Sequence, residues 1–589
     1  MAALFTTPKR NDTTAGTHVA EPDVRRRIGL AHGSWRRVTR RIVAGAVCAL
    51  TVSSLLMPSV SLAAEWVKVG GNKYNTAASD EAGTWSWDGA DDLKLNNYNG
   101  GEIQAAGKLN VNYSGTNIVT AEWIESINVS HGTNENAELN IQGDAGSTLS
   151  VTSTEDAILS TGNINIDGAG SVNATSTGFD AINAGGDLAI KGSGNVNATG
   201  ASDGIRANGN ITIDDSGAVT ARATEDKGIG TDKNLTIKGG GTVEASSADG
   251  EALWSGGNIN ISDGSQVKAS SEKDAAVEAK GSLAATNASL NVNGVEYGVY
   301  AHKGITFDHA NVTVRAGKGR YGGAIALFTY QDDIVVKNGS TVDAFAEGEV
   351  SAAFSTRNDR PNEKGGHIYI SDSVVKAIAR YVENGDGPTP YSENQDGETR
   401  REPQGENIGI VAQTSEGIMP ATISIVRSKV TAEGDTAAIF ALAMSADGKT
   451  IGTIKIENAA IQTPEGGKVI DYRKLRDGIY EAGQAIGTGD ATVDSLYIKA
   501  VAKSTTIAPP EVAKPEDPKP DETKPAESKQ NPKPEGSKPT KAVAASTTKA
   551  KTTGVLAATG DTSGAAIVAT VLAGTAAIAA GTMASRKRS

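Results

Sequence analysis

Four consecutive stretches of the chain read NINIDGAGSVNATSTGFDAINAGG (163–186), DLAIKGSGNVNATGASDGIRANG (187–209), NITIDDSGAVTARATEDKGIGTDK (210–233) and NLTIKGGGTVEASSADGEALWSGG (234–257). They share one pattern of apolar and turn-forming residues, which recurs about every 24 residues between Leu139 and Ala443. A fixed short period indicates stacked, structurally equivalent units. Such a protein offers long repetitive faces rather than one deep cleft.

Each unit contains three short runs in which apolar and polar residues alternate, as in Ile164-x-Ile166, Val172-x-Ala174 and Ile182-x-Ala184. Alternation with period two predicts strands with one buried face, and the Gly, Asp, Asn and Ser residues between the runs are typical of turns. We therefore predict an all-β fold, a right-handed parallel β-helix with coils of about 24 residues, in which equivalent residues stack in columns. The alternative, a set of antiparallel sandwiches, is disfavoured by the constant register. One predicted buried column contains Ile164, Leu188, Ile211, Leu235 and Ile259.

The flanking segments differ in composition from the repeats. Residues 1–63 carry a basic stretch, an apolar run and small residues, which is the order of a secretory signal peptide. We assign 64–136 to an N-terminal cap and first irregular coils, 137–463 to the repeats and 464–503 to a C-terminal cap, because bare terminal coils would be sticky sheet edges. Residues 504–555 are rich in Pro, Lys and Glu and predict a disordered, extended stalk.

The C-terminal segment 556–589 combines a pentapeptide, an apolar run over 564–584 and a basic tail. This arrangement resembles a sortase cell-wall sorting signal in its high-GC Gram-positive form, with Ala where Pro is usual. The resemblance implies sortase cleavage between Thr559 and Gly560, attachment to peptidoglycan on the cell surface, and membrane contact only through a transient helix over 564–584. A plain membrane anchor is the alternative. The pentapeptide is Leu556, Ala557, Ala558, Thr559 and Gly560.

The start of the predicted mature chain contains Thr84-Trp-Ser-Trp-Asp-Gly89, followed by Leu93-x-Leu95-Asn96. Together with the repeats, this resembles bacterial surface proteins described as carbohydrate-binding-domain or pectate-lyase-like β-helix proteins. The resemblance implies the fold; it implies no particular activity, and no site residue is carried over from it.

Charge and cysteine content exclude several classes of function. The only cysteine, Cys48, lies in the predicted signal peptide, so the mature chain has neither a disulfide nor a cysteine metal site. Removal of 1–63 and 560–589 changes the net charge from −13 to about −21. That charge disfavours nucleic acid and anionic membranes as partners.

Acidic residues recur just before the third run of successive units, at Asp156, Asp180 and Asp203, and are followed by Lys227 and Glu251. Stacked carboxylates repel one another, so a bound Ca²⁺ or backbone amides must compensate their charge. Aspartate at turns commonly accepts hydrogen bonds from nearby backbone amides. We favour that interpretation over a cation site and predict no required cofactor.

Aromatic residues are expected on one outer face, at Trp254, Tyr300, Phe354 and Phe440. This candidate ligand face could stack on sugar rings or contact a protein. The alternative is a satellite core in which long loops cover these rings. One such loop, the insertion between Val382 and Asn407, is either a binding loop or disordered, and its composition favours disorder.

These features favour a non-catalytic, cell-wall-anchored surface protein, an adhesin or a glycan- or protein-binding rod on a stalk. Its expected partners are sortase, peptidoglycan and a host or environmental glycan or surface protein. The first alternative is a lyase or hydrolase of extracellular acidic polysaccharide, which would need clustered carboxylates and a proton-accepting base. The second alternative is a passive structural coat protein.

Overall fold

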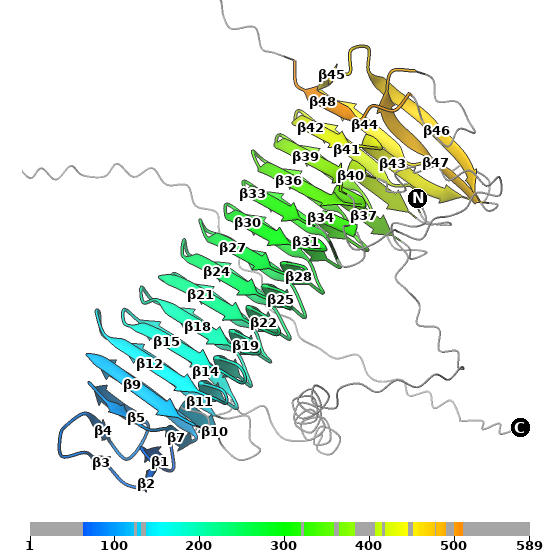
Figure 1. Cartoon of the computed structure of the whole chain (residues 1–589). Coiled ribbons are helices and arrows are strands. Elements are labelled where there is room, and N and C mark those ends of the chain that lie inside the picture. The colour runs from blue at the N-terminus through cyan, green and yellow to red at the C-terminus, as the bar shows by residue number, and fades with distance from the viewer. Residues whose placement is uncertain are drawn as a thin grey trace, which may run out of the picture. The chain divides into compact units, whose positions relative to one another are not determined.

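The computed structural model describes residues 63–122, 127–130, 137–317, 319, 323–358, 365–382, 407–414, 419–445, 451–476, 479–489 and 500–510. The regular secondary structure of these residues is all β (Figure 1). No helix among them is long and apolar enough to cross a bilayer. The predicted signal peptide up to residue 62, the insertion 383–406, the stalk beyond residue 510 and the sorting signal lie outside the described residues.

The strands build three long sheets, which we call sheets A, B and C. From β5 to β45, successive strands along the chain enter sheets A, C and B in turn. Sheet A contains, in spatial order, β3 (Ala78–Ser79), β4 (Trp85–Trp87), β5 (Asp92–Asn96), β8 (Lys108–Ser114), β11 (Glu138–Gly143), β14 (Asn163–Gly168), β17 (Leu188–Lys191), β20 (Ile211–Asp214), β23 (Leu235–Lys238), β26 (Ile259–Ile261), β29 (Leu283–Thr286), β32 (Ile305–Asp308), β35 (Ile334–Lys337), β38 (Ile368–Ser371), β41 (Thr422–Val426) and β44 (Thr453–Glu457).

Sheets B and C complete the stack. Sheet B contains β2 (Asn72–Tyr74), β1 (Val67–Val69), β7 (Ile103–Ala106), β10 (Ile127–Ser130), β13 (Ile158–Ser160), β16 (Ile182–Ala184), β19 (Ile205–Ala207), β22 (Ile229–Thr231), β25 (Leu253–Ser255), β28 (Val277–Ala279), β31 (Tyr297–Ala301), β34 (Gly323–Thr329), β37 (Val350–Asn358), β40 (Asn407–Thr414), β43 (Ala437–Ser445), β47 (Ile479–Gly487) and β46 (Lys468–Arg476). Sheet C contains β6 (Asn99–Gly100), β9 (Thr116–Ala121), β12 (Thr148–Ser153), β15 (Ser171–Ser176), β18 (Val196–Gly200), β21 (Ala218–Ala223), β24 (Thr242–Ser247), β27 (Gln266–Ser271), β30 (Ser289–Gly294), β33 (Asn311–Ala316), β36 (Thr341–Gly348), β39 (Val374–Tyr381), β42 (Lys429–Gly434), β48 (Ser504–Ala508) and β45 (Ala460–Thr463).

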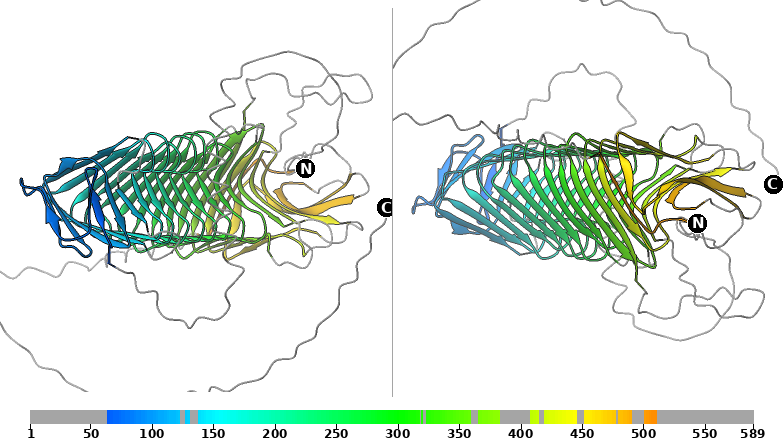
Figure 2. Two further views of the ribbon diagram at one scale, coloured as in Figure 1. Left: turned by 90° about the horizontal axis from the view of Figure 1, so that it is seen from below. Right: turned by 90° about the horizontal axis from the view of Figure 1, so that it is seen from above.

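Neighbouring strands within the body of each sheet are parallel, as the repeat predicts. In sheet A, Ile164 pairs with Leu188, Leu188 with Ile211, Ile211 with Leu235, and Leu235 with Ile259. The side chains of this column are at most 1% exposed, because they point into the core enclosed by the three sheets. The all-β class with long parallel sheets is therefore confirmed, and the arrangement is compatible with a β-helix. Figure 2 shows the stacked strands from two further sides.

The corner between sheets A and C repeats in a left-handed backbone conformation. Asp263, Asn287 and Asn338 have φ values of 57°, 49° and 56° at this corner. Asn and Asp adopt this conformation more readily than most residues, which explains why the sequence places them after the sheet A strands.

Antiparallel strands close both ends of the stack. At the N-terminal end, β1 pairs with β2 and β4 with both β3 and β5. At the C-terminal end, the β46–β47 hairpin packs against β43, and β48 lies between β42 and β45. Such pairing covers edges that would otherwise template aggregation.

The structure corrects the predicted boundary between cap and stalk. Strand β48 falls inside the range assigned to the disordered stalk, yet Thr505 and Ile507 are fully buried. The boundary at residue 503 was wrong. The apolar alternation of this strand is short and adjoins a Pro-rich segment, so the composition of the whole segment indicates disorder even though these few residues form a strand. Parallel stacking begins with β5 and β8, inside the segment predicted as cap and first irregular coils.

Candidate functional site

The outer row of sheet B contains three of the four predicted aromatic residues, Trp254, Tyr300 and Phe440. Side chains alternate across a strand, so the residue after each buried third-run residue points outward. In the observed register, Gly230 pairs with Trp254, Trp254 with Glu278, and Glu278 with Tyr300. Trp254 and Tyr300 are both partly exposed there.

Phe354 does not belong to this row, and its predicted outward position was wrong. Phe354 pairs with Leu327 on one side and Ile410 on the other, and it is fully buried in the core. The outward neighbours of Tyr300 are instead Phe328 and then Ser355. The reason is that residues 324–328 of β34 are all buried, so the alternation that sets the register is absent there.

Phe440 occupies the outer row but is buried by the C-terminal cap. Its exposed fraction is 1%, and its ring packs edge-on against Tyr472 of β46 at a centroid distance of 5.2 Å. Phe328 is 5% exposed and lies with Phe440 in a second apolar cluster. A satellite core therefore forms at this end of the row, but at Phe440 it is covered by the cap strand β46, where long loops were expected, and Phe440 does not form a ligand face.

Trp254 lies in a group of charged side chains that we call the Trp254 cluster. Its ring centroid is 5.3 Å from Lys227 Nζ and 5.9 Å from the Arg206 guanidinium carbon. Lys227 Nζ is 3.9 Å from a carboxylate oxygen of Glu251, and Glu278 lies on the next strand. The π face of the tryptophan is thus already engaged by cations of the same protein. The Trp254 cluster comprises Asp203, Arg206, Lys227, Glu251, Trp254 and Glu278.

Two carboxyl groups of the Trp254 cluster have strongly raised pKa values. Burial, reinforced by Asp180 and Asp226, raises the pKa of Asp203 to about 7. Burial also raises the pKa of Glu251, and its hydrogen bond with Glu278 adds to this effect. Burial acts on Glu278 in the same direction, but hydrogen bonds with His302 and Lys280 outweigh it and lower the Glu278 pKa.

The predicted Asp ladder uses backbone amides for compensation. Asp156 Oδ1 accepts the Asp180 N–H at 3.0 Å, Asp180 Oδ1 accepts the Asp203 N–H at 2.9 Å, and Asp203 Oδ1 accepts the Lys227 N–H at 2.7 Å. The Asn183 amide bridges the other oxygens of Asp156 and Asp180, each at 3.0 Å. These amides belong to the following coil, so the ladder links neighbouring units.

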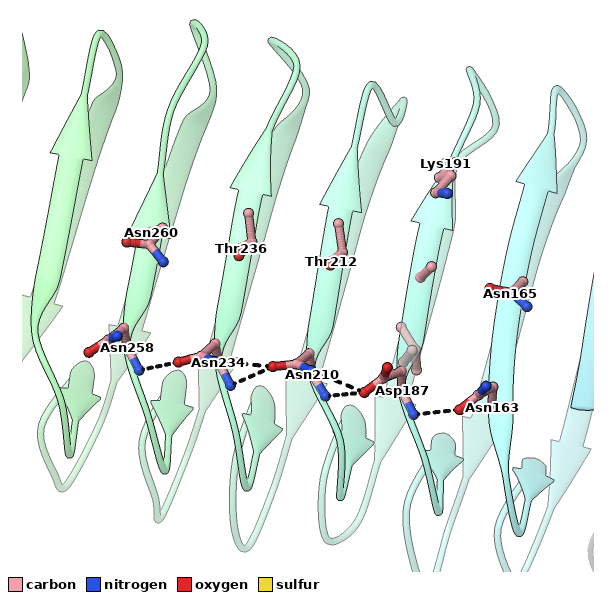
Figure 3. Close-up of a pocket in the computed structure, with 12 residues that line it drawn as sticks. Asn163, Asn165, Asp187, Lys191, Asn210, Thr212, Asn234, Thr236, Asn258 and Asn260 are labelled. Atoms are coloured by element: carbon pink, nitrogen blue, oxygen red, sulfur yellow. Dashed lines mark hydrogen bonds between the residues drawn. The ribbon is translucent and has the colours of Figure 1, made fainter. Parts of the chain in front are cut away.

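A polar groove runs over the outer face of sheet A (Figure 3). Its first row repeats the ladder chemistry: the Asp187 N–H donates to Asn163 Oδ1 at 2.8 Å, and the Asn258 N–H donates to Asn234 Oδ1 at 2.9 Å. A second row projects from the middle of the strands. This row consists of Asn165, Ala189, Thr212, Thr236 and Asn260.

The sequence pattern did not lead us to predict one further group of acidic residues. Asp88, Asp91 and Asp92 place ligand-type oxygens within 4.8 Å of one another. Asp88 Oδ1 accepts the N–H groups of Ala90 and Asp92 at 2.8 and 3.1 Å, which is a turn-stabilising role. The spacing of the three aspartates around a turn was the available signal.

Together these observations define an all-β protein with three long, largely parallel sheets, a polar groove on the outer face of sheet A, and an outer row on sheet B in which Trp254 and Tyr300 are partly exposed. Comparisons with protein-family models, curated proteins and solved structures find no match to the chain.

Proposed function

We propose that this chain is a non-catalytic surface protein, a right-handed parallel β-helix with coils of about 24 residues that binds an extended glycan through its lateral face. The signal-like segment 1–63 would export it. The sorting-signal resemblance of 556–589 would place it on the cell wall of a Gram-positive bacterium, above a disordered stalk.

The polar groove on sheet A is the observation that carries the binding proposal. Thr212, Thr236 and Asn260 present hydroxyl and amide groups on strands about 4.8 Å apart. A linear glycan also repeats its hydroxyl groups at short regular intervals. The groove therefore offers hydrogen-bonding partners along several sugar units, with Lys191 on β17 and Asp187 just before it, one strand in from the β14 end of the groove. This moves the favoured ligand surface from the aromatic row, whose rings are engaged within the protein, to the groove.

A glycan array probed with the mature protein tests this function. Replacement of three second-row residues together, Thr212→Ala, Thr236→Ala and Asn260→Ala, should abolish binding because it removes the hydroxyl and amide groups that face the glycan. The fold should be retained, since these side chains are not part of the hydrogen-bonded ladder that joins the coils. The matched control is Thr220→Ala, Ser246→Ala and Ser270→Ala on the outer face of sheet C. Equal binding by both triple variants would reject the groove as the site. Absence of binding to every glycan and surface protein tested would favour a passive coat role.

Polysaccharide cleavage is the second candidate function, and the Trp254 cluster favours it. Asp203 and Glu251 have raised pKa values beside Arg206 and Lys227, and such perturbed groups are common at catalytic sites. Incubation with acidic polysaccharide, with and without Ca²⁺, should then yield shortened or unsaturated products, and Glu251→Gln should abolish them. Intact polysaccharide after prolonged incubation would reject this candidate.

A further inference from the structure

Strand β48 interrupts the order of sheet C at its C-terminal end. Every strand of this sheet from β6 to β42 pairs in parallel with the strand of the adjacent coil. Strand β45 is the next in that succession, yet it does not pair with β42. Instead β48 lies between them, antiparallel to both, and Ile507 pairs with Val430 on one side and Ile461 on the other.

The corner that leads into β45 is still stacked on the preceding coil. Asn458 adopts the left-handed conformation of the repeating corner, with φ of 52°, as does Arg427 one coil earlier, with φ of 46°. The Arg427 N–H donates to the Glu457 carbonyl at 3.0 Å, and the same corner-to-corner bond joins Asp372 to Val426. The two coils are therefore in contact at the corner and separate only where β48 enters.

The sequence of β45 continues the column that β42 belongs to. Strands β41 and β44 pair with Ile423 opposite Ile454 and Ile425 opposite Ile456. Extended past the corner, the same register places Ile461 on Val430, Gln462 on Thr431 and Thr463 on Ala432. An apolar residue would thus follow Val375 and Val430 in the buried column, which is apolar in every coil from Leu149 of β12 onward.

Strand β48 fits its place imperfectly. Thr505 pairs with Ala432, in a column that earlier coils fill with Ala344 and Ala377. Its side chain is fully buried, and among the described residues its hydroxyl finds no hydrogen-bond partner. A buried hydroxyl without a partner costs free energy in the inserted arrangement. The released register places Thr463 opposite Ala432 in the same column, so the two arrangements carry a similar cost at this position.

We propose that β48 is a releasable strand, and that β45 closes onto β42 as a further parallel pair when β48 leaves. The two arrangements satisfy the same edge of β42 with alternative partners, which makes the end of the stack bistable. Strand β48 is followed directly by Pro509 and Pro510. If the chain is anchored through its C-terminus, as proposed above, tension on the stalk acts on β48 before any other strand. The alternative pairing itself does not depend on that anchoring.

Disulfide trapping in the full chain, with Cys48→Ser throughout, distinguishes the two arrangements. The pair Thr431→Cys and Gln462→Cys reports the released state. With β48 inserted, these residues are about two strand spacings apart, roughly 10 Å, which is too far for a disulfide. The pair Thr431→Cys and Thr506→Cys reports the inserted state, because Thr431 and Thr506 are direct partners.

We expect the inserted-state pair to oxidise in the otherwise unchanged chain and the released-state pair to remain reduced. Adding Ile507→Asp, which puts a charge at a fully buried position, should accelerate released-state oxidation by more than about tenfold. Ile507→Ala should give an intermediate rate, and circular dichroism should keep its β signal in all variants. Failure of the Thr431–Gln462 disulfide to form in the Ile507→Asp chain would overturn the proposal. Equal oxidation rates with and without Ile507→Asp would overturn it as well.

Discussion

At the scale of single residues, Asp203 shows how stacking changes an ordinary turn aspartate. Its carboxylate accepts the Lys227 N–H, while Arg206 Nε is 4.0 Å from its other oxygen. Only 6% of the side chain is exposed, so burial outweighs these favourable contacts and raises the pKa to about 7.

This raised pKa predicts a stability change in a defined pH window. The folded chain holds the Asp203 proton more tightly than the unfolded chain, whose ordinary value is 3.8. The stability that the folded chain gains by binding this proton is therefore fully present below about pH 4 and is lost as the pH rises through about 7. Asp203→Asn keeps an oxygen for the Lys227 N–H and removes the charge. As the pH rises from 4 to 8, we expect the free energy of unfolding of the variant to increase by up to about 4 kcal/mol relative to that of the parent chain.

Urea unfolding at intervals across that pH range measures this difference. Asp187→Asn is the matched control, because Asp187 holds the equivalent ladder position in an exposed row otherwise made of Asn. The same pH slope for Asp203→Asn and the parent chain would contradict the assignment.

The residue scale was only partly predictable. The spacing of Asp156, Asp180 and Asp203 predicted stacked carboxylates satisfied by amides, and the structure agrees. Which amides they use, and which of them becomes deeply buried, depends on the neighbouring coil. The outward position of Trp254 followed from the alternation. Its contacts with Arg206 and Lys227 did not, because these two residues occupy different positions in the preceding coils.

At the scale of one coil, the turns from sheet C to sheet B differ in length. Glycine begins two turns that are one residue shorter than the turn after Ala223. Four residues separate Gly200 from Ile205 and Gly294 from Val299, whereas five separate Ala223 from Ile229. A Cβ atom at Gly200 would lie 2.0 Å from the Asp203 carbonyl oxygen, and one at Gly294 would lie 1.9 Å from that of Tyr297. The short turn brings the backbone back too closely for any side chain.

Gly200→Ser is therefore expected to destabilise the chain by roughly 1–3 kcal/mol or more, since backbone atoms must move to admit the side chain. Ala223→Ser, at the paired position of the next coil, should change the free energy of unfolding much less. Thermal denaturation of the two variants provides the comparison. An equal loss of stability in both would show that turn length does not set the need for glycine.

Element register was predictable wherever alternation was clean and failed where it was not. Strands such as β17 and β20, with one apolar face, pair as the sequence predicts. Strands β34 and β37 are buried on both faces, so sequence alternation does not say which residues point inward. The core position of Phe354 follows from its pairing with Leu327, which is a tertiary contact.

At the scale of the whole molecule, each coil contacts chiefly its two neighbours, so stability should be nearly additive along the stack. Deletion of residues 210–233 removes one complete unit and joins Gly209 to Asn234. We expect this chain to remain folded, with Leu188 now paired with Leu235. Deletion of 210–221, half a unit, should disrupt the local register. Circular dichroism and limited proteolysis compare the two deletions, and equal protease sensitivity would contradict modular stacking.

The proposed anchoring makes a separate prediction about location. Thr559→Ala should prevent sortase cleavage, so that the protein moves from the cell-wall fraction to the membrane or the medium. Thr553→Ala, outside the pentapeptide, is the control. Fractionation and immunoblotting measure the distribution. Unchanged wall attachment of the Thr559→Ala protein would reject the sorting-signal interpretation.

The sequence by itself determined the all-β class, the parallel order of the strands and the buried columns, because those depend on a local two-residue alternation repeated at a constant spacing. Only the tertiary structure decided how the ends close, where Phe354 and Phe440 lie, and that Ser504–Ala508 forms a strand inside sheet C. Those outcomes arise from contacts between segments far apart in the chain, which no local pattern encodes.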